Sequence, residues 1–185
     1  MKMNVNGNTL KLLTGDITKQ TTDAIVNAAN GTLMGGGGVD GAIHKAAGSE
    51  LLAACKQVRQ EELHGDYLGT GEAVITPGFR LPASYVIHTV GPIWDKNHIK
   101  QDEQLSNCYK NALELANKHN LTSISFPSIS TGIYRFPIDR AAKIALTTIK
   151  TYLEQHKFGY VAMVLFSNKD YQTYEQALKT LQNRQ

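Results

Sequence analysis

Short apolar runs alternate along the chain with longer segments in which apolar residues recur every three or four positions. The short runs predict strands at 9–13, 24–27, 73–76, 85–90, 122–126 and 161–166. The longer segments predict helices at 40–47, 49–62, 102–119, 138–155 and 168–181, with Ser49 as an N-cap. Alternating strands and helices are typical of an α/β fold in which helices cover both faces of a mostly parallel sheet. Adjacent short strands leave room for antiparallel pairs, so we expect a mixed sheet.

Composition excludes several classes of protein. With 185 residues, 42% of them hydrophobic and 19% charged, the sequence predicts one domain over residues 1–185 and not a disordered or disulfide-stabilised chain. Cys55 and Cys108 have no paired spacing, which favours free thiols in a reducing, cytoplasmic compartment. No apolar run approaches the roughly 18 residues of a membrane span, and no signal-peptide pattern is present. The net charge of +3 does not by itself favour nucleic acid or a membrane surface.

In α/β sheets, ligands bind beyond the carboxyl ends of strands, and a glycine cluster follows one predicted strand. Gly35–Gly38 have no Cβ atoms, so their N–H groups can approach a ligand closely, and the helix that follows adds the positive end of its dipole. This pattern favours a phosphate site. The glycines alone are equally compatible with a flexible linker or a packing turn. Neither the P-loop nor the dinucleotide-binding glycine pattern is present.

Asp40 and His44 are separated by four residues and therefore share one face of the predicted helix. Asp40 is either an N-cap or a carboxylate that points into the crevice and orients a water molecule. His44 is either a half-buried polar residue or part of the same site. Because a carboxylate at a helix start is stabilised by the dipole, we expect a lowered pKa for Asp40 and hence a weak base.

Three further segments at strand ends carry candidate chemistry. The hydroxyl-rich segment 127–134 can offer donors to a second phosphate face, or it is an ordinary turn. Asp16 can accept from an exocyclic amine such as that of adenine, or it caps a local turn. Phe166 can stack on a base, or it belongs to the core. The histidines and cysteines show no zinc-type spacing, and we expect no metal and no cofactor.

Several of these segments together resemble a macro domain, and specifically its MacroD-type branch. The resemblance rests on segments 15–18, 25–30, 35–44, 88–92 and 126–134, above all on Asn-Ala-Ala-Asn followed by Gly-Gly-Gly-Gly-Val-Asp-Gly-Ala-Ile-His. It is closest to the bacterial O-acetyl-ADP-ribose deacetylases. The resemblance implies a three-layer α/β/α sandwich around a mixed, mostly parallel sheet, with a crevice for ADP-ribose. One departure is Arg135, where similar proteins commonly carry glycine.

The resemblance also implies roles for individual residues. Asp16 would hold the adenine amine, with the Ile17 amide on the ring and Phe166 beside it. The predicted catalytic set is Asp40, Asn30 and His44, in which Asn30 contacts the distal ribose and His44 supports the Asp40 region. The other predicted ligand contacts are Asn27, Gly37, Gly38, Val39, Ser130, Thr131, Gly132, Ile133 and Tyr134.

The implied activity is hydrolysis at the distal ribose of ADP-ribose adducts. Expected substrates are O-acetyl-ADP-ribose and proteins mono-ADP-ribosylated on acidic side chains, attacked by a water held between Asp40 and the substrate diphosphate. We expect a monomer that binds ADP-ribose and has no membrane or nucleic-acid partner. Two alternatives remain open. One is a module that binds ADP-ribose without turnover, and the other is an RNA-linked role supported only by the mild positive charge.

Overall fold

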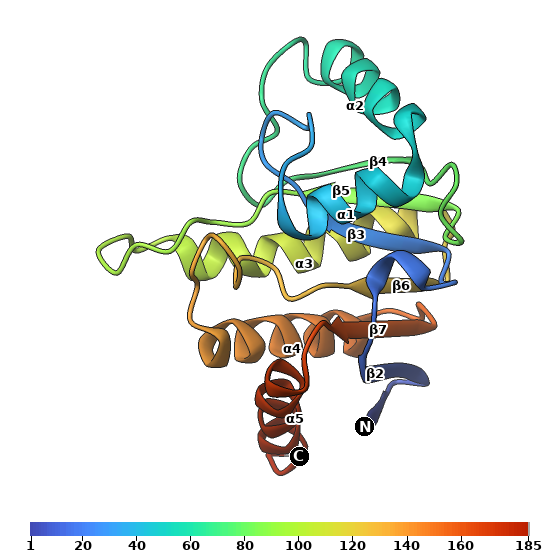
Figure 1. The fold of residues 1–185 in the computed structure, drawn as a ribbon. Helices are drawn as coiled ribbons and strands as arrows, with labels where there is room; N and C mark the ends of the chain where they lie inside the picture. Colours follow the sequence, from blue (N-terminus) through green and yellow to red (C-terminus); the bar gives the residue numbers. More distant parts are fainter. Residues whose placement is uncertain (185) are drawn as a thin grey trace.

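A seven-stranded sheet in the order β1-β2-β7-β6-β3-β5-β4 forms the centre of the molecule in the computed structural model (Figure 1). The four inner strand pairs are parallel, and the two outer pairs, β1–β2 and β4–β5, are antiparallel. This confirms the expected mixed, mostly parallel sheet. The strands are β1 Lys2–Val5, β2 Asn8–Thr14, β3 Ala24–Ala28, β4 Ala73–Pro77, β5 Tyr85–Thr89, β6 Ser123–Phe126 and β7 Tyr160–Leu165.

Helices cover both faces of the sheet. Neighbouring residues of one strand point to opposite faces, so Ile25 of β3 belongs to one buried apolar cluster and Val26 to another. The cluster that contains Val26 includes residues of α3 Gln101–Lys118, α4 Ile138–Gln155 and α5 Asn168–Gln182. The cluster that contains Ile25 includes residues of α1 Gly38–Ala47, α2 Ser49–Glu61 and the 3₁₀ turn η1 Ile17–Lys19. The three layers agree with the predicted sandwich.

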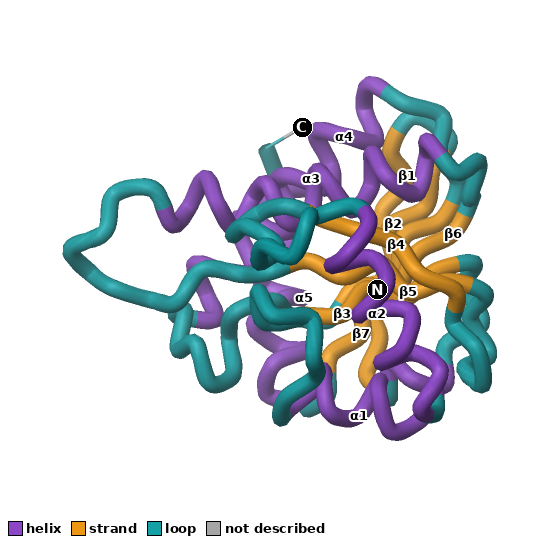
Figure 2. The backbone as a smooth tube through the Cα atoms, turned by 90° about the horizontal axis from the view of Figure 1, so that it is seen from above, coloured by secondary structure: helices purple, strands orange, loops and turns teal. Residues whose placement is uncertain are grey.

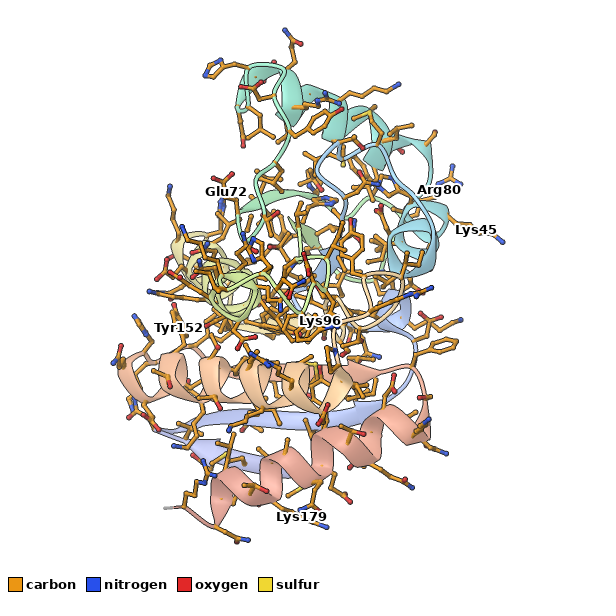
Figure 3. The ribbon with its side chains drawn as sticks, turned by 90° about the vertical axis from the view of Figure 1, so that its left-hand side faces the viewer. Lys45, Glu72, Arg80, Lys96, Tyr152 and Lys179 are labelled. Carbon is orange, nitrogen blue, oxygen red and sulfur yellow. The ribbon has the colours of Figure 1, made fainter. Side chains whose placement is uncertain are left out.

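The structure describes residues 1–184. Gln185, the last residue of the expected domain, lies outside the described residues. Loops gather at one side of the molecule, where the long loop between β5 and α3 projects (Figure 2). Lys45 of α1 and Lys179 of α5 point outward from separate parts of the surface (Figure 3), so these two charges do not form one basic patch.

Three local expectations were wrong or incomplete. Ser49 is the first residue of α2 and not its N-cap; the cap position is Gly48, at φ +88°. Helix α1 begins at Gly38, so Asp40 lies within its first turn and the N-cap interpretation of Asp40 is wrong. Strand β1 was not predicted at all, although Asn6 and Gly7 carry the signal for it. Both have positive φ, which a two-residue hairpin turn between β1 and β2 requires.

Candidate functional site

A cavity of about 670 Å³ lies where β3, β6 and β7 end, within the size range of small-molecule sites. Residues of two loops contribute to its walls: loop A, residues 29–37 before α1, and loop B, residues 127–135 after β6. All predicted site residues line the cavity except Asn27 and His44. The lining includes Asp16, Ile17, Asn30, Gly37, Gly38, Val39, Asp40, Ser130, Thr131, Gly132, Ile133, Tyr134 and Phe166.

Loop A reaches α1 by a path that only glycine fits well. Gly35 and Gly38 have φ of +86° and +59°, a region that other residues rarely adopt. A Cβ on Gly41 would lie 2.5 Å from the Gly36 carbonyl oxygen, so the loop folds back directly onto the helix. The first N–H groups of α1 have no partner within the helix and lie at the cavity wall. This arrangement suits an anion.

The hydroxyl groups of two buried tyrosines, Tyr109 and Tyr174, hydrogen-bond to loop B. The Tyr109 hydroxyl on α3 accepts from the Ile129 N–H at 3.0 Å and donates to the Pro127 carbonyl at 3.3 Å. The Tyr174 hydroxyl on α5 lies 2.6 Å from Ser128 Oγ. Burial raises the pKa of both phenols, that of Tyr174 to about 12, so both remain neutral hydrogen-bonding groups. The loop that is predicted to face the diphosphate is therefore fixed by the core.

At one end of the cavity, Asp16 and Phe166 lie at the surface. Asp16 Oδ1 accepts from the Thr18 N–H at 2.9 Å and from Thr18 Oγ1 at 2.7 Å, so Asp16 caps η1 and also lines the cavity. The Thr18 hydroxyl and N–H lower the pKa of Asp16. The core interpretation of Phe166 is wrong, because its side chain follows β7 and is 90% exposed. A flat apolar ring is thus available to a planar ligand.

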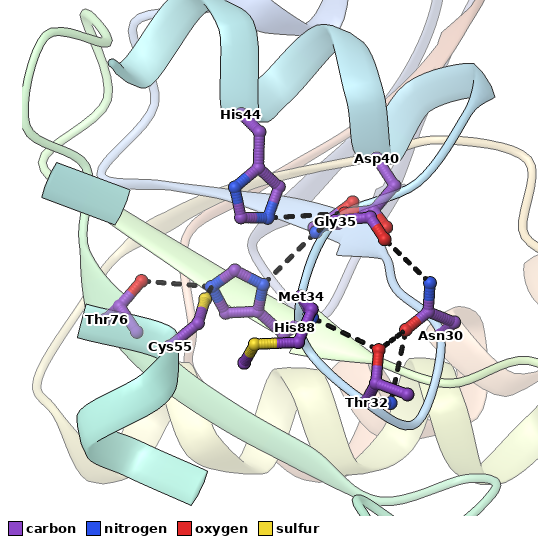
Figure 4. A network of polar contacts seen from close by, with 10 residues as sticks. Asn30, Thr32, Met34, Gly35, Asp40, His44, Cys55, Thr76 and His88 are labelled. Atoms are coloured by element: carbon purple, nitrogen blue, oxygen red, sulfur yellow. Dashed lines mark hydrogen bonds and ion pairs between the residues drawn. The ribbon is translucent and has the colours of Figure 1, made fainter. Parts of the chain in front are cut away.

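At the other end, the carboxylate of Asp40 lies beside the amide of Asn30 (Figure 4). A Cβ on Gly36 would lie 3.3 Å from Asp40 Oδ2 and 3.2 Å from Asn30 Nδ2, so both polar atoms flank the same bare backbone position. Asn30 is oriented by its own loop: Nδ2 donates to the Gly35 carbonyl at 2.9 Å, and Oδ1 accepts from the Thr32 N–H at 3.1 Å.

The pKa of Asp40 is raised and not lowered, contrary to the expectation from its place at a helix start. Asp40 is buried, and burial disfavours the charged carboxylate more strongly than its neighbours favour it. The Asn27 amide, 2.8 Å from Oδ1, and His44, whose Nε2 lies 3.5 Å from Oδ1, act in the opposite direction. The carboxylate is therefore a better proton acceptor than an exposed aspartate. His44 itself is half-buried and contacts the carboxylate from outside the cavity lining.

Several residues that matter to the site were missed by the sequence reasoning. Gly91 and Asp170 line the cavity but were not predicted to do so, and Gly36 was predicted only as part of the glycine run. A Cβ on Gly91 would overlap Ser130 Oγ, so this glycine lets loop B approach the chain that follows β5. Gly36 and Gly91 stand within the quoted motifs, which is the signal that was available. Arg135 is exposed at φ +59°, the conformation that a glycine adopts more easily.

Comparison with known proteins identifies the family. The macro-domain family model matches residues 26–145. The chain belongs to the macro-domain family. A macro domain-containing protein of Lactiplantibacillus plantarum is 49% identical over 176 residues, covering 94% of this chain and 98% of its own.

Two solved macro domains show the same fold. The Oceanobacillus iheyensis macrodomain with ADP is 58% identical, with a TM-score of 0.98 over 100% of this chain and 97% of the other. The Trypanosoma brucei macrodomain in complex with ADP-ribose is 40% identical, with a TM-score of 0.82 over 91% of this chain and 68% of the other.

Two further observations concern the macro domain as a whole. Within residues 1–184, no three His, Cys, Asp or Glu side chains are grouped closely enough to hold a metal ion. Among the helices described for those residues, none has the length and apolar character needed to cross a membrane.

Proposed function

We propose that this macro domain is a hydrolase of ADP-ribose adducts, as the MacroD-type resemblance implies. The observation that carries the proposal is the Asp40 carboxylate, buried, with a raised pKa, and beside the Asn30 amide at one end of the crevice. The substrates are O-acetyl-ADP-ribose and proteins with mono-ADP-ribose on acidic side chains. The complexes of similar macrodomains with ADP and with ADP-ribose support the choice of ligand.

The ligand would span the crevice from Asp16 to Asp40. Adenine lies against Phe166, with its amine on Asp16 and its ring on the Ile17 N–H. The diphosphate accepts from backbone N–H groups of loop B and of the first turn of α1, at Gly38 and Val39. Because backbone dipoles hold the phosphates, the site does not need lysine or arginine. The distal ribose then reaches Asn30.

A water molecule placed between Asp40 and the diphosphate is the nucleophile. For O-acetyl-ADP-ribose, its oxygen bonds to the ester carbonyl carbon, the bond from that carbon to the ribose oxygen breaks to release acetate, and the ribose oxygen takes the proton that Asp40 has accepted from the water. Asp40 orients the water and accepts its proton as the new bond forms. Positioning by the two loops and the backbone donors supplies most of the acceleration.

The alternative is a macro domain that binds ADP-ribose without turning it over. The deciding experiment compares wild type and Asp40→Ala on two substrates, O-acetyl-ADP-ribose and a mono-ADP-ribosylated protein, with ADP-ribose affinity measured on the same preparations. We expect turnover of both substrates by wild type and loss of turnover, but not of binding, in the variant. Wild type that binds ADP-ribose and releases no product would establish the binding module instead. A cytoplasmic location and a monomeric state remain predictions.

A further inference from the structure

A network of hydrogen-bonded polar side chains begins at Asp40, and its other members lie outside the cavity lining (Figure 4). It runs from Asp40 on α1 to Asn27 on β3, His88 on β5 and Thr76 on β4. The last three side chains come from three neighbouring strands and are at most 2% exposed. None of them was predicted to act in this way, and Asn27 was predicted to contact the ligand directly.

Only one assignment of donors and acceptors satisfies every hydrogen bond in this network. Asn27 Nδ2 has two protons, and it lies 2.8 Å from Asp40 Oδ1 and 3.1 Å from His88 Nδ1. Since Nδ2 only donates, His88 Nδ1 must accept and the ring proton must be on Nε2. That Nε2–H then donates to Thr76 Oγ1 at 3.0 Å. Burial lowers the pKa of His88 to about 3, which keeps the ring neutral and Nδ1 an acceptor.

The network gives the two carboxylate oxygens of Asp40 different surroundings. Oδ1 is held by Asn27, whereas Oδ2 lies next to Gly36 and is available to the crevice. The amide can serve both Asp40 and His88 only with its nitrogen between them. In this orientation the carbonyl oxygen of Asn27 is buried without a hydrogen-bond partner among the described residues. Such an unpaired oxygen lowers stability. We therefore attribute the orientation of the amide to its hydrogen bonds with Asp40 and His88 and not to packing.

We propose that Asn27 and His88 are positioning residues for Asp40: His88 holds the Asn27 amide, and the amide fixes the carboxylate for the water that attacks the substrate. This inference rests on the proposed hydrolase function for its kinetic consequence, but not for its structural one. It replaces the predicted direct contact of Asn27 with the ligand.

Two substitutions of His88 separate positioning from packing. The amide oxygen of asparagine can take the place of Nδ1, so His88→Asn keeps an acceptor for Asn27. The amide of glutamine extends to the place of Nε2, so His88→Gln keeps a partner for Thr76 but leaves Asn27 without its acceptor. Both variants remove the ring and retain an amide, and each serves as the control for the other.

The kinetic test uses O-acetyl-ADP-ribose with the full chain. We expect His88→Gln to lower kcat about 10–100-fold, since a small misplacement of a reacting group has effects of this size. We expect His88→Asn to recover most of that loss. The affinity for ADP-ribose should be the same in both variants, because His88 and Asn27 lie outside the cavity lining. Equal kcat values in the two variants, or loss of ADP-ribose affinity, would overturn the proposal.

A second readout does not depend on turnover. The titratable groups that face Asp40 are His44 on α1, Cys55 on α2 and, through Asn27, His88. The pKa of the Cys55 thiol is raised to about 12, so neither it nor the neutral His88 changes charge near neutral pH. The Asn27 hydrogen bond lowers the pKa of Asp40, so weakening that bond must raise it further.

Carbon-13 NMR titration of the Asp40 carboxyl group should therefore give a higher pKa in His88→Gln than in wild type, and a value near wild type in His88→Asn. Three equal pKa values would refute the positioning role even if wild type proved to be a hydrolase. If wild type had no activity, the proposed function would fail while this titration still decided the inference. Should His88→Gln not fold, Thr76→Val tests the same network by removing the hydroxyl that pairs with His88 Nε2. The same rise in the pKa of Asp40 is expected.

Discussion

At Asp40, burial and hydrogen bonding act on the same carboxylate in opposite directions, and burial is the larger effect. A helix start alone favours the charged form, so a sequence pattern that places an aspartate there indicates a lowered pKa. The opposite result comes from burial of the side chain in the folded protein, which depends on segments far from residue 40 and cannot be read from the local pattern. The place of Asp40 in the crevice was predictable from the sequence, but the direction of its pKa shift was not.

The raised pKa of Asp40 predicts a stability effect with a definite sign. Because the folded-state pKa lies above the unfolded value, the native state favours the neutral acid, and stability is lost as pH rises through the folded pKa. Asp40→Asn should therefore raise Tm at about pH 7 and give no such gain near pH 3, where the acid is already neutral in both states. Thermal unfolding followed by circular dichroism at the two pH values checks this. An equal gain in Tm at both pH values would show that the effect arises from packing and not from the charge of Asp40.

Asp16 has two roles to separate, the cap of η1 and the predicted contact with adenine. Asp16→Ala should weaken ADP-ribose binding about 10–100-fold, the effect of losing one hydrogen bond to a charged group. Asp16→Ser can still cap the turn but is too short to reach the amine, so it should weaken binding by a similar factor. Calorimetry with ADP-ribose measures both. If Asp16→Ser bound as tightly as wild type, the cap alone would explain the role of Asp16.

Among the elements, strand register brings the distant polar residues together. Asn27 and His88 are direct partners in the parallel pairing of β3 with β5, although 61 positions separate them in the chain. Each strand was predicted from its own apolar pattern, but the pairing that places a histidine beside an asparagine is a property of the sheet. The glycine path of loop A is different, because Gly35–Gly38 and Gly41 all lie within one short segment that the sequence displays.

The attachment of loop B to α5 gives a prediction at the same scale. Tyr174→Phe removes the hydroxyl that pairs with Ser128 at 2.6 Å. It should lower the free energy of unfolding by about 1 kcal/mol and also weaken ADP-ribose binding, because the loop is predicted to face the diphosphate. Tyr152→Phe is the control. Tyr152 lies near the C-terminal end of α4, whereas loop B precedes the N-terminal end of that helix. Removing the Tyr152 hydroxyl should therefore leave the affinity for ADP-ribose unchanged. Equal affinities in wild type and Tyr174→Phe would show that loop B does not need this support.

Across the whole molecule, the sheet order and the two apolar clusters place both loops at the same edge. The alternation of strands and helices was enough to predict this arrangement, because parallel strands must end at a common edge. The antiparallel strand β1 was missed because its four residues form too short an apolar pattern. It lies at the outer edge of the sheet, at a distance of several strands from Asp40, and its omission did not affect the predicted site.

Ligand binding should stabilise the whole fold. ADP-ribose at about 100 times its Kd is expected to add roughly 2.7 kcal/mol to the free energy of unfolding, which corresponds to a rise of about 5–10 °C in Tm for a domain of this size. Asp40→Ala should show a comparable shift, because the proposed binding mode holds the ligand mainly through groups elsewhere in the crevice. Thermal shift titration measures this, and a chain whose Tm does not respond to ADP-ribose would have no such site.

We propose that Asp40 performs chemistry on a ligand that the rest of the crevice binds. Single-turnover release of acetate from O-acetyl-ADP-ribose, measured for wild type and Asp40→Asn alongside the Kd of each for ADP-ribose, tests this most directly. We expect acetate release to be at least about 100-fold slower in the variant, the usual contribution of a general base, with nearly unchanged affinity for ADP-ribose. Acetate release at the wild-type rate by Asp40→Asn, or none by wild type, would contradict it.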